Sequence, residues 1–114
     1  MIQRLDSNRR RSRAVLHAGL IHFAGQAADD FTGDITQQTS EALARIDRLL
    51  AEFGSHRSRI LSATVWLKTM DDYAGMNAIW DAWIDPDNAP ARSCGVVAMA
   101  DPSMRVEVIL IAAA

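Results

Sequence analysis

The spacing of apolar side chains along the chain predicts two helices. After Asp34 or Thr36, either of which can cap a helix start, apolar residues recur every three or four positions up to Gly54. These residues are Leu43, Ile46, Leu49, Leu50 and Phe53. Gly54 is typical of the position just past a helix end. A second helix is expected to start after Asp71 or Asp72. Its stripe is formed by Tyr73, Met76, Asn77, Trp80 and Trp83.

Apolar runs between turn residues predict the strands. The expected strands cover residues 14–18, 20–25, 59–68, 91–99 and 104–112, with an optional short one at residues 2–5. The first two surround a turn near Ala18-Gly19. In the strand at residues 59–68, alternation places one set of side chains on each face. The first set is Leu61, Ala63, Val65 and Leu67, and the second is Thr64 and Trp66.

The resulting order β-β-α-β-α-β-β in 114 residues predicts one domain, residues 1–114, built as a two-layer α/β sandwich. The two helices would cover one face of the sheet. In a domain this small, the simplest cover for the other face is another copy of the same chain. We therefore expect an oligomer.

Composition narrows the classes of function. A hydrophobic fraction of 49% argues against disorder, and a net charge of −2 gives no general attraction to nucleic acid or an anionic membrane. The single cysteine, Cys94, cannot form an intrachain disulfide, which fits the cytoplasm. No apolar run approaches the ~20 residues of a membrane span. The three histidines lack metal-ligand spacing, and no phosphate loop or dinucleotide motif is present, so we expect neither metal nor cofactor.

Two charged residues interrupt apolar strands and are the first candidates for chemistry. Arg92 lies two residues before Cys94, and Glu107 stands inside the run Val106–Ile111. Charges are costly to bury unless they are paired, hydrogen-bonded or used on a ligand. A simple hairpin of the last two strands would place Glu107 on the face of Arg92 and Cys94. The alternatives are an ion pair of Glu107 with Arg92 or Arg105, and a plain core role for Cys94.

Five motifs follow one another along the chain in a characteristic order. They are Ala24-Gly25-Gln26, Gln38-Thr39, Ile60–Leu67, Met76–Trp80 and Ala89-Pro90-Ala91-Arg92-Ser93-Cys94. With these motifs the chain resembles, from about residue 14 onward, the RidA (YjgF-type) family of imine/enamine deaminases, also labelled L-PSP endoribonucleases. The segment Asn77–Trp83 resembles the YoaB-like branch of that family.

The resemblance implies a chorismate-mutase-like fold and a homotrimer whose sheets form an inner barrel, with a cleft at each subunit interface. It also implies the hydrolysis of small 2-imino acids to 2-keto acids and ammonia, without cofactor or metal.

The resemblance further assigns roles to individual residues. Arg92 would hold the substrate carboxylate, and Glu107 would position or activate the attacking water. The remaining site residues would be Cys94, Asn77, Ala24, Gly25 and Arg11. Two of these depart from the usual pattern, because Arg11 stands where many members carry tyrosine and Ala24 where serine often precedes Gly-Gln.

Two competing functions belong to other classes. A trimer that only binds small carboxylates, or acts as a chaperone, would use an arginine clamp equally well. RNA cleavage is suggested by the older family label and by the basic run Arg9–Arg13. The acidic net charge and the absence of an aromatic residue among these arginines count against RNA as a partner. A small imino acid is therefore the expected substrate.

Overall fold

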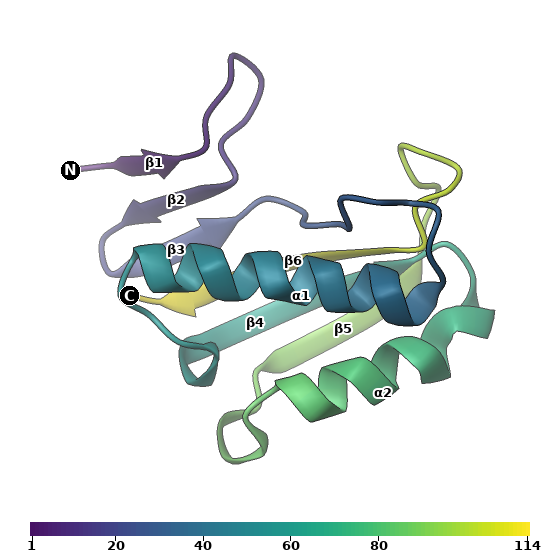
Figure 1. The fold of residues 1–114 in the computed structure, drawn as a ribbon. Coiled ribbons are helices and arrows are strands. Elements are labelled where there is room, and N and C mark those ends of the chain that lie inside the picture. The colour runs from purple at the N-terminus through teal and green to yellow at the C-terminus, as the bar shows by residue number, and fades with distance from the viewer.

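The computed structural model describes residues 1–114 as a six-stranded sheet with both long helices on the same side (Figure 1). The strands are β1 (Gln3–Leu5), β2 (Ala14–His17), β3 (Leu20–Phe23), β4 (Ile60–Leu67), β5 (Ala91–Val96) and β6 (Val106–Ala113). The helices are α1 (Ile35–Glu52) and α2 (Tyr73–Trp83), and the short 3-10 turns are η1 (Arg57–Arg59), η2 (Met70–Asp72) and η3 (Pro86–Asn88). The predicted two-layer architecture is confirmed, including the short first strand.

The strand order β1-β2-β3-β6-β4-β5 differs from the expectation for the last two strands. β4 and β5 pair in parallel through the α2 crossover, while β6 runs antiparallel between β3 and β4. A β-α-β unit requires its two strands to run parallel. β6 therefore returns on the other side of β4, and the expected hairpin between the last two strands is wrong.

Local signals fix the ends of α1. The side chain of Asp34 accepts a hydrogen bond from the backbone N–H of Gln37 at 2.9 Å, and Gly54 follows the helix with a φ of 71°. Asp72 occupies the N-cap position of α2 but makes no capping bond with its side chain. Its carboxylate instead accepts hydrogen bonds from Nη1 of Arg105 at 3.3 and 3.2 Å, so the residue serves an ion pair.

One apolar core fills the space between the sheet and the helices. Its largest contributions come from Leu43, Ile46, Leu49 and Leu50 of α1, Ala63, Val65 and Leu67 of β4, Met76 and Trp80 of α2, and Val106, Val108 and Leu110 of β6. Leu61 was expected on this face but is 50% exposed, because a bulge between Ile60 and Ser62 shifts the register there. Tyr73 was expected on the α2 stripe and is also exposed.

No helix covers the opposite face of the sheet (Figure 1). The register places Trp66, Ile109 and Ile111 on this face, together with Val15 and His22 of the N-terminal hairpin. The uncovered face is therefore partly apolar. Neither helix has the length and apolar character needed to cross a membrane.

Leu67 provides a test of this packing, because its side chain is fully buried at the end of β4. We expect Leu67→Ala to lower the free energy of unfolding by about 2–5 kcal/mol through lost burial and the cavity left behind. The volume-conserving Leu67→Met should cost less than about 1.5 kcal/mol. Urea denaturation of both variants measures the difference, and equal small losses would show that this side of β4 does not face the core.

Candidate functional site

Arg92 lies on the edge strand β5 and turns toward α2. It pairs with the buried Ala63 in the neighbouring strand, so both side chains lie on the helix side of the sheet. Nη1 of Arg92 donates to Oδ1 of Asn77 at 2.8 Å, and the guanidinium carbon lies 5.3 Å from the centre of the Trp80 ring. The same nitrogen is 3.9 Å from the sulfur of Met76. These contacts fix the plane of the guanidinium.

None of these neighbours neutralises Arg92. Its partners are an amide, an aromatic ring and a thioether, and no carboxylate lies within ion-pair distance. A half-buried, unpaired cation with a fixed orientation is suited to bind an anionic ligand.

Cys94 joins this group, because it pairs with Val65 and lies on the same face as Arg92. It is half-buried and packs against the core. The structure thus brings Arg92, Asn77 and Cys94 together at the β5 edge. Trp80 was expected only to pack in the apolar stripe of the second helix, and the structure also places its ring beside Arg92. Trp80 lies three residues after Asn77 on the same helix, so the two side chains share one helix face. This spacing was the signal that could have placed Trp80 beside the arginine.

Glu107 lies on the opposite face of the sheet. It pairs with Trp66 and stands between the buried Val106 and Val108, so its side chain points to the uncovered face. No hydrogen bond or ion pair involves its carboxylate, and neither expected pairing, with Arg92 or with Arg105, is formed. Burial raises the pKa of Glu107 above its ordinary value.

Gly25 approaches the carboxyl group of Glu107 so closely that a Cβ atom at this position would overlap it. Gln26 holds the glycine in place, because its backbone exchanges two hydrogen bonds with Val108 at 2.8 and 2.9 Å. The Gln26 side chain also donates to the carbonyl oxygen of Ala24 at 2.8 Å. The segment Ala24-Gly25-Gln26 thus forms a fixed wall beside Glu107.

The predicted residues therefore form two separate groups within the chain. β4 lies between β5 and β6, and the partner of Glu107 across the sheet is Gly95, three residues from Arg92. Strand spacing of about 4.8 Å and a rise of about 3.3 Å per residue put the two backbones roughly 14 Å apart, with the side chains on opposite faces. The expectation that Glu107 shares the face of Arg92 and Cys94 is wrong. One small molecule cannot contact both charges of the same chain.

Arg11 belongs to neither group. It lies in the loop between β1 and β2, where its Nη1 donates to the carbonyl oxygen of Asp6 at 2.7 Å. The nearby Arg13 donates to Oε1 of the Gln26 side chain at 3.2 Å. Two arginines of the basic run are therefore tied to neighbouring parts of the chain.

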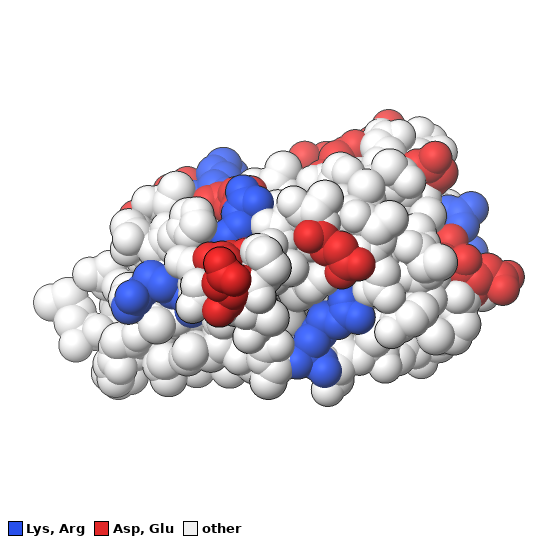
Figure 2. All heavy atoms as spheres, turned by 90° about the horizontal axis from the view of Figure 1, so that it is seen from below, with Lys and Arg blue, Asp and Glu red and all other residues white.

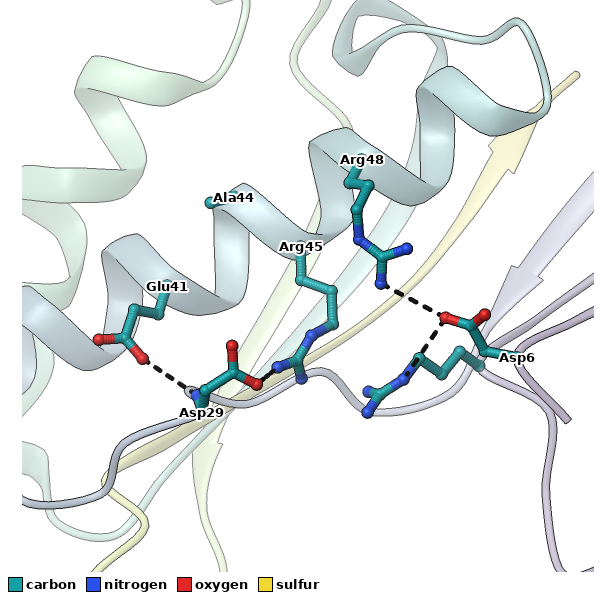
Figure 3. Close-up of a pocket in the computed structure, with 7 residues that line it drawn as sticks. Asp6, Asp29, Glu41, Ala44, Arg45 and Arg48 are labelled. Carbon is teal, nitrogen blue, oxygen red and sulfur yellow. Dashed lines mark hydrogen bonds and ion pairs between the residues drawn. The ribbon is translucent and has the colours of Figure 1, made fainter. Parts of the chain in front are cut away.

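A pocket of about 490 Å³ lies between the base of this loop and α1 (Figure 3). Its charged lining residues are Asp6, Arg13, Asp29, Glu41, Arg45 and Arg48. The carboxylate of Asp6 lies 3.8 Å from Nε of Arg13 and 3.3 Å from Nη2 of Arg48. Figure 3 shows Asp6 beside Arg48, and Asp29 paired with Arg45. Burial and the neighbouring cations lower the pKa of Arg45. Asp6 and Asp29 pair with the three arginines, and Glu41 accepts the backbone N–H of Asp29 at 3.0 Å. These contacts connect the N-terminal hairpin and the following loop to α1, and leave no cation here without a partner.

Charges elsewhere on the surface are mixed in sign. Figure 2 shows acidic and basic side chains interspersed among uncharged ones on the side of the molecule where α2 lies. No three side chains of His, Cys, Asp or Glu are grouped so as to hold a metal ion. Arg92 and Glu107, which have no ion-pair partner, are thus the candidate ligand-binding residues.

Comparison with known proteins decides the family. A sequence model of the family described as "Endoribonuclease L-PSP" matches residues 1–114. The chain belongs to the YjgF/L-PSP family. It is 42% identical to a RutC family protein of Haemophilus ducreyi, over 99% of this chain and 97% of that protein. It is 36% identical to the RutC family protein YoaB of Escherichia coli, over 98% and 97% of the two chains.

A solved YjgF-family structure from Neisseria meningitidis has the same fold. Its TM-score is 0.95 at 39% identity, covering 99% of this chain and 94% of that one. The predicted resemblance to the YjgF-type family and the predicted fold are both confirmed.

The raised pKa of Glu107 predicts a pH-dependent stability. Because the folded chain holds this proton more tightly than the unfolded chain, the free energy of unfolding falls as pH rises above about 4.5 through the raised pKa. Glu107→Gln lacks the buried charge, so it should match the wild type at pH 4 and be more stable at pH 7. Urea denaturation at both pH values tests this, with the exposed Asp81→Asn as control. A Glu107→Gln variant less stable than the wild type at pH 7 would contradict the prediction.

Proposed function

We propose that the protein hydrolyses small 2-imino acids to 2-keto acids and ammonia, in a cleft between subunits of a homotrimer. The observation that carries this proposal is the unpaired Arg92, held in one plane by Asn77 and Trp80. Membership of the YjgF/L-PSP family supports the same chemistry. A 2-imino acid presents a carboxylate next to its reacting carbon, so an arginine that binds the carboxylate also orients that carbon.

Glu107 is the proposed partner of the attacking water. Water adds to the imine carbon of the protonated substrate, and Glu107 accepts a proton from that water. Glu107 then passes this proton to the amino group of the tetrahedral intermediate. As the carbon–nitrogen bond breaks and ammonia leaves, the hydroxyl group gives its proton to Glu107 and the carbon–oxygen double bond of the keto acid forms. Glu107 finally returns the proton to ammonia, which departs as ammonium. A carboxyl group whose pKa is raised by burial is suited to accept and return a proton near neutral pH.

The two groups would meet across a subunit interface. In one chain Arg92 and Glu107 face opposite sides of the sheet, so a complete site needs Arg92 from one subunit and Glu107 from its neighbour. The uncovered face with Trp66, Ile109 and Ile111 is an apolar surface that a second copy would cover. In such a site Gly25 would leave the ligand room to approach Glu107.

Substitution of Arg92 tests the carboxylate clamp. An amino acid oxidase or dehydratase generates 2-imino acids in place, and keto-acid release is followed for each variant. Two charge-assisted hydrogen bonds are worth enough that Arg92→Ala should lose about 100-fold or more in kcat/KM, with a smaller loss for Arg92→Lys. Arg59→Ala removes an exposed arginine at the far end of β4 and should keep wild-type activity.

The same assay separates deamination from simple binding. Circular dichroism must show that Arg92→Ala remains folded. If the wild type accelerates no member of a panel of small and bulky imino acids, the deaminase proposal fails. Saturable binding of 2-keto acids without turnover would then identify a carboxylate-binding protein.

Mixing two inactive variants tests the shared site. Arg92→Ala and Glu107→Gln are unfolded together at a 1:1 ratio and refolded, so that mixed trimers form. A site with Arg92 from one subunit and Glu107 from the next is intact at about a quarter of the interfaces, so about a quarter of wild-type activity should return. Refolding each variant alone is the control. If the mixture stays inactive while each variant assembles normally, the two residues do not act across an interface.

A further inference from the structure

A second cavity, of about 410 Å³, lies at the end of the sheet where three segments meet. The connection from β3 to α1 contributes Phe31-Thr32-Gly33, the end of β4 contributes Lys68-Thr69, and the loop before β6 contributes Pro102-Ser103 and Arg105. None of these residues belongs to the two groups around Arg92 and Glu107. The cavity is therefore separate from the proposed deaminase residues.

The charges of this cavity are of one sign. Lys68 and Arg105 line it, and no carboxylate does. Lys68 takes part in no ion pair, and its Nζ contacts only the carbonyl oxygen of Pro102. Arg105 uses Nη1 for Asp72, which leaves the other nitrogens of its guanidinium without a hydrogen-bond partner. The pocket of Figure 3, between the N-terminal hairpin and α1, differs because carboxylates line it alongside its cations.

A buried glutamine holds the walls of this cavity together. Gln38 of α1 is fully buried, and its Nε2 lies within hydrogen-bond distance of the carbonyl oxygens of Phe31, Gly33 and Ser103, at 3.3, 3.0 and 3.1 Å. Its Oε1 accepts the backbone N–H of Arg105 at 2.9 Å. One side chain thus connects α1 with two of the three wall segments, and Lys68 connects the third through Pro102. The backbone segments that carry the two cations are thus tied to one another around the cavity.

We propose that this cavity binds a phosphate group, either as inorganic phosphate or as part of a phosphomonoester. A phosphate has several acceptor oxygens in different directions, and Lys68, Arg105 and the hydroxyl groups of Thr69 and Ser103 offer donors from separate walls. The compact ammonium group of lysine is a common phosphate ligand. A planar carboxylate would need only one guanidinium fork, so it would use fewer of these donors.

Phosphate titration of the intact protein tests the proposal. Isothermal calorimetry at pH 8 and constant ionic strength should give saturable binding of inorganic phosphate to the wild type, with backbone amide shifts at Thr32, Thr69 and Ser103 in NMR spectra. Lys68→Gln should weaken binding by about tenfold or more, and Lys68→Arg should retain most of it. The control Arg59→Gln removes one positive charge elsewhere and should bind like the wild type.

Comparing the affinities of different anions shows which chemical group the cavity recognises. Glycerol 2-phosphate that binds at least as well as inorganic phosphate identifies an ester site, and weaker binding identifies a site for the free ion; both outcomes support the phosphate assignment. Acetate binding as tight as phosphate binding would overturn it. Absence of saturable binding, or equal affinity in Lys68→Gln and the wild type, would also overturn it. These outcomes do not depend on imine hydrolysis, because Lys68 is not part of that proposed site.

Discussion

The arrangement of the whole molecule depends on the central position of its last strand. β6 pairs with β3 on one side and with β4 on the other, so it joins the N-terminal hairpin to the β4–α2–β5 unit. Its helix-facing side chains are at most 1% exposed, and they provide one wall of the core along the full length of the strand. Because side chains alternate along a strand, this burial forces Glu107 to the opposite face. Because β6 pairs with β4 and not with β5, β4 separates Glu107 from Arg92.

Local parts of the fold could be predicted from the sequence, because short-range signals determine them. The helical stripe around Ile46, the cap at Asp34 and the glycine at Gly54 place α1 correctly. Strand pairing is different, since it depends on contacts between distant segments that no local pattern specifies. The bulge that exposes Leu61 likewise leaves no clear mark in an alternating apolar run.

In the candidate site, too, some properties could be predicted from the sequence and others depend on the strand pairing. Arg92 and Glu107 could be found from the sequence, because a charge in an apolar strand is visible without a structure. Their faces could not be found, since these follow from the strand order. The contact of Arg92 with Asn77 arises because the α2 crossover passes back over the strand that it connects. The sequence thus identified the charged residues, and the topology determined which of them share a face.

The buried side chain of Gln38 couples the local opening of two loops at one end of the sheet. Its amide group bonds to the β3–α1 connection and to the loop before β6, where Ser103 lies 65 residues after Gln38 in the chain. If either loop opened alone, the buried amide would lose part of its hydrogen bonds, at a cost of about 1–3 kcal/mol for each group left unpaired. The two loops should therefore open as one cooperative unit during local unfolding, and their amide protons should exchange with solvent at correlated rates. A single side chain would then set the dynamics of a region that the sequence divides into separate segments.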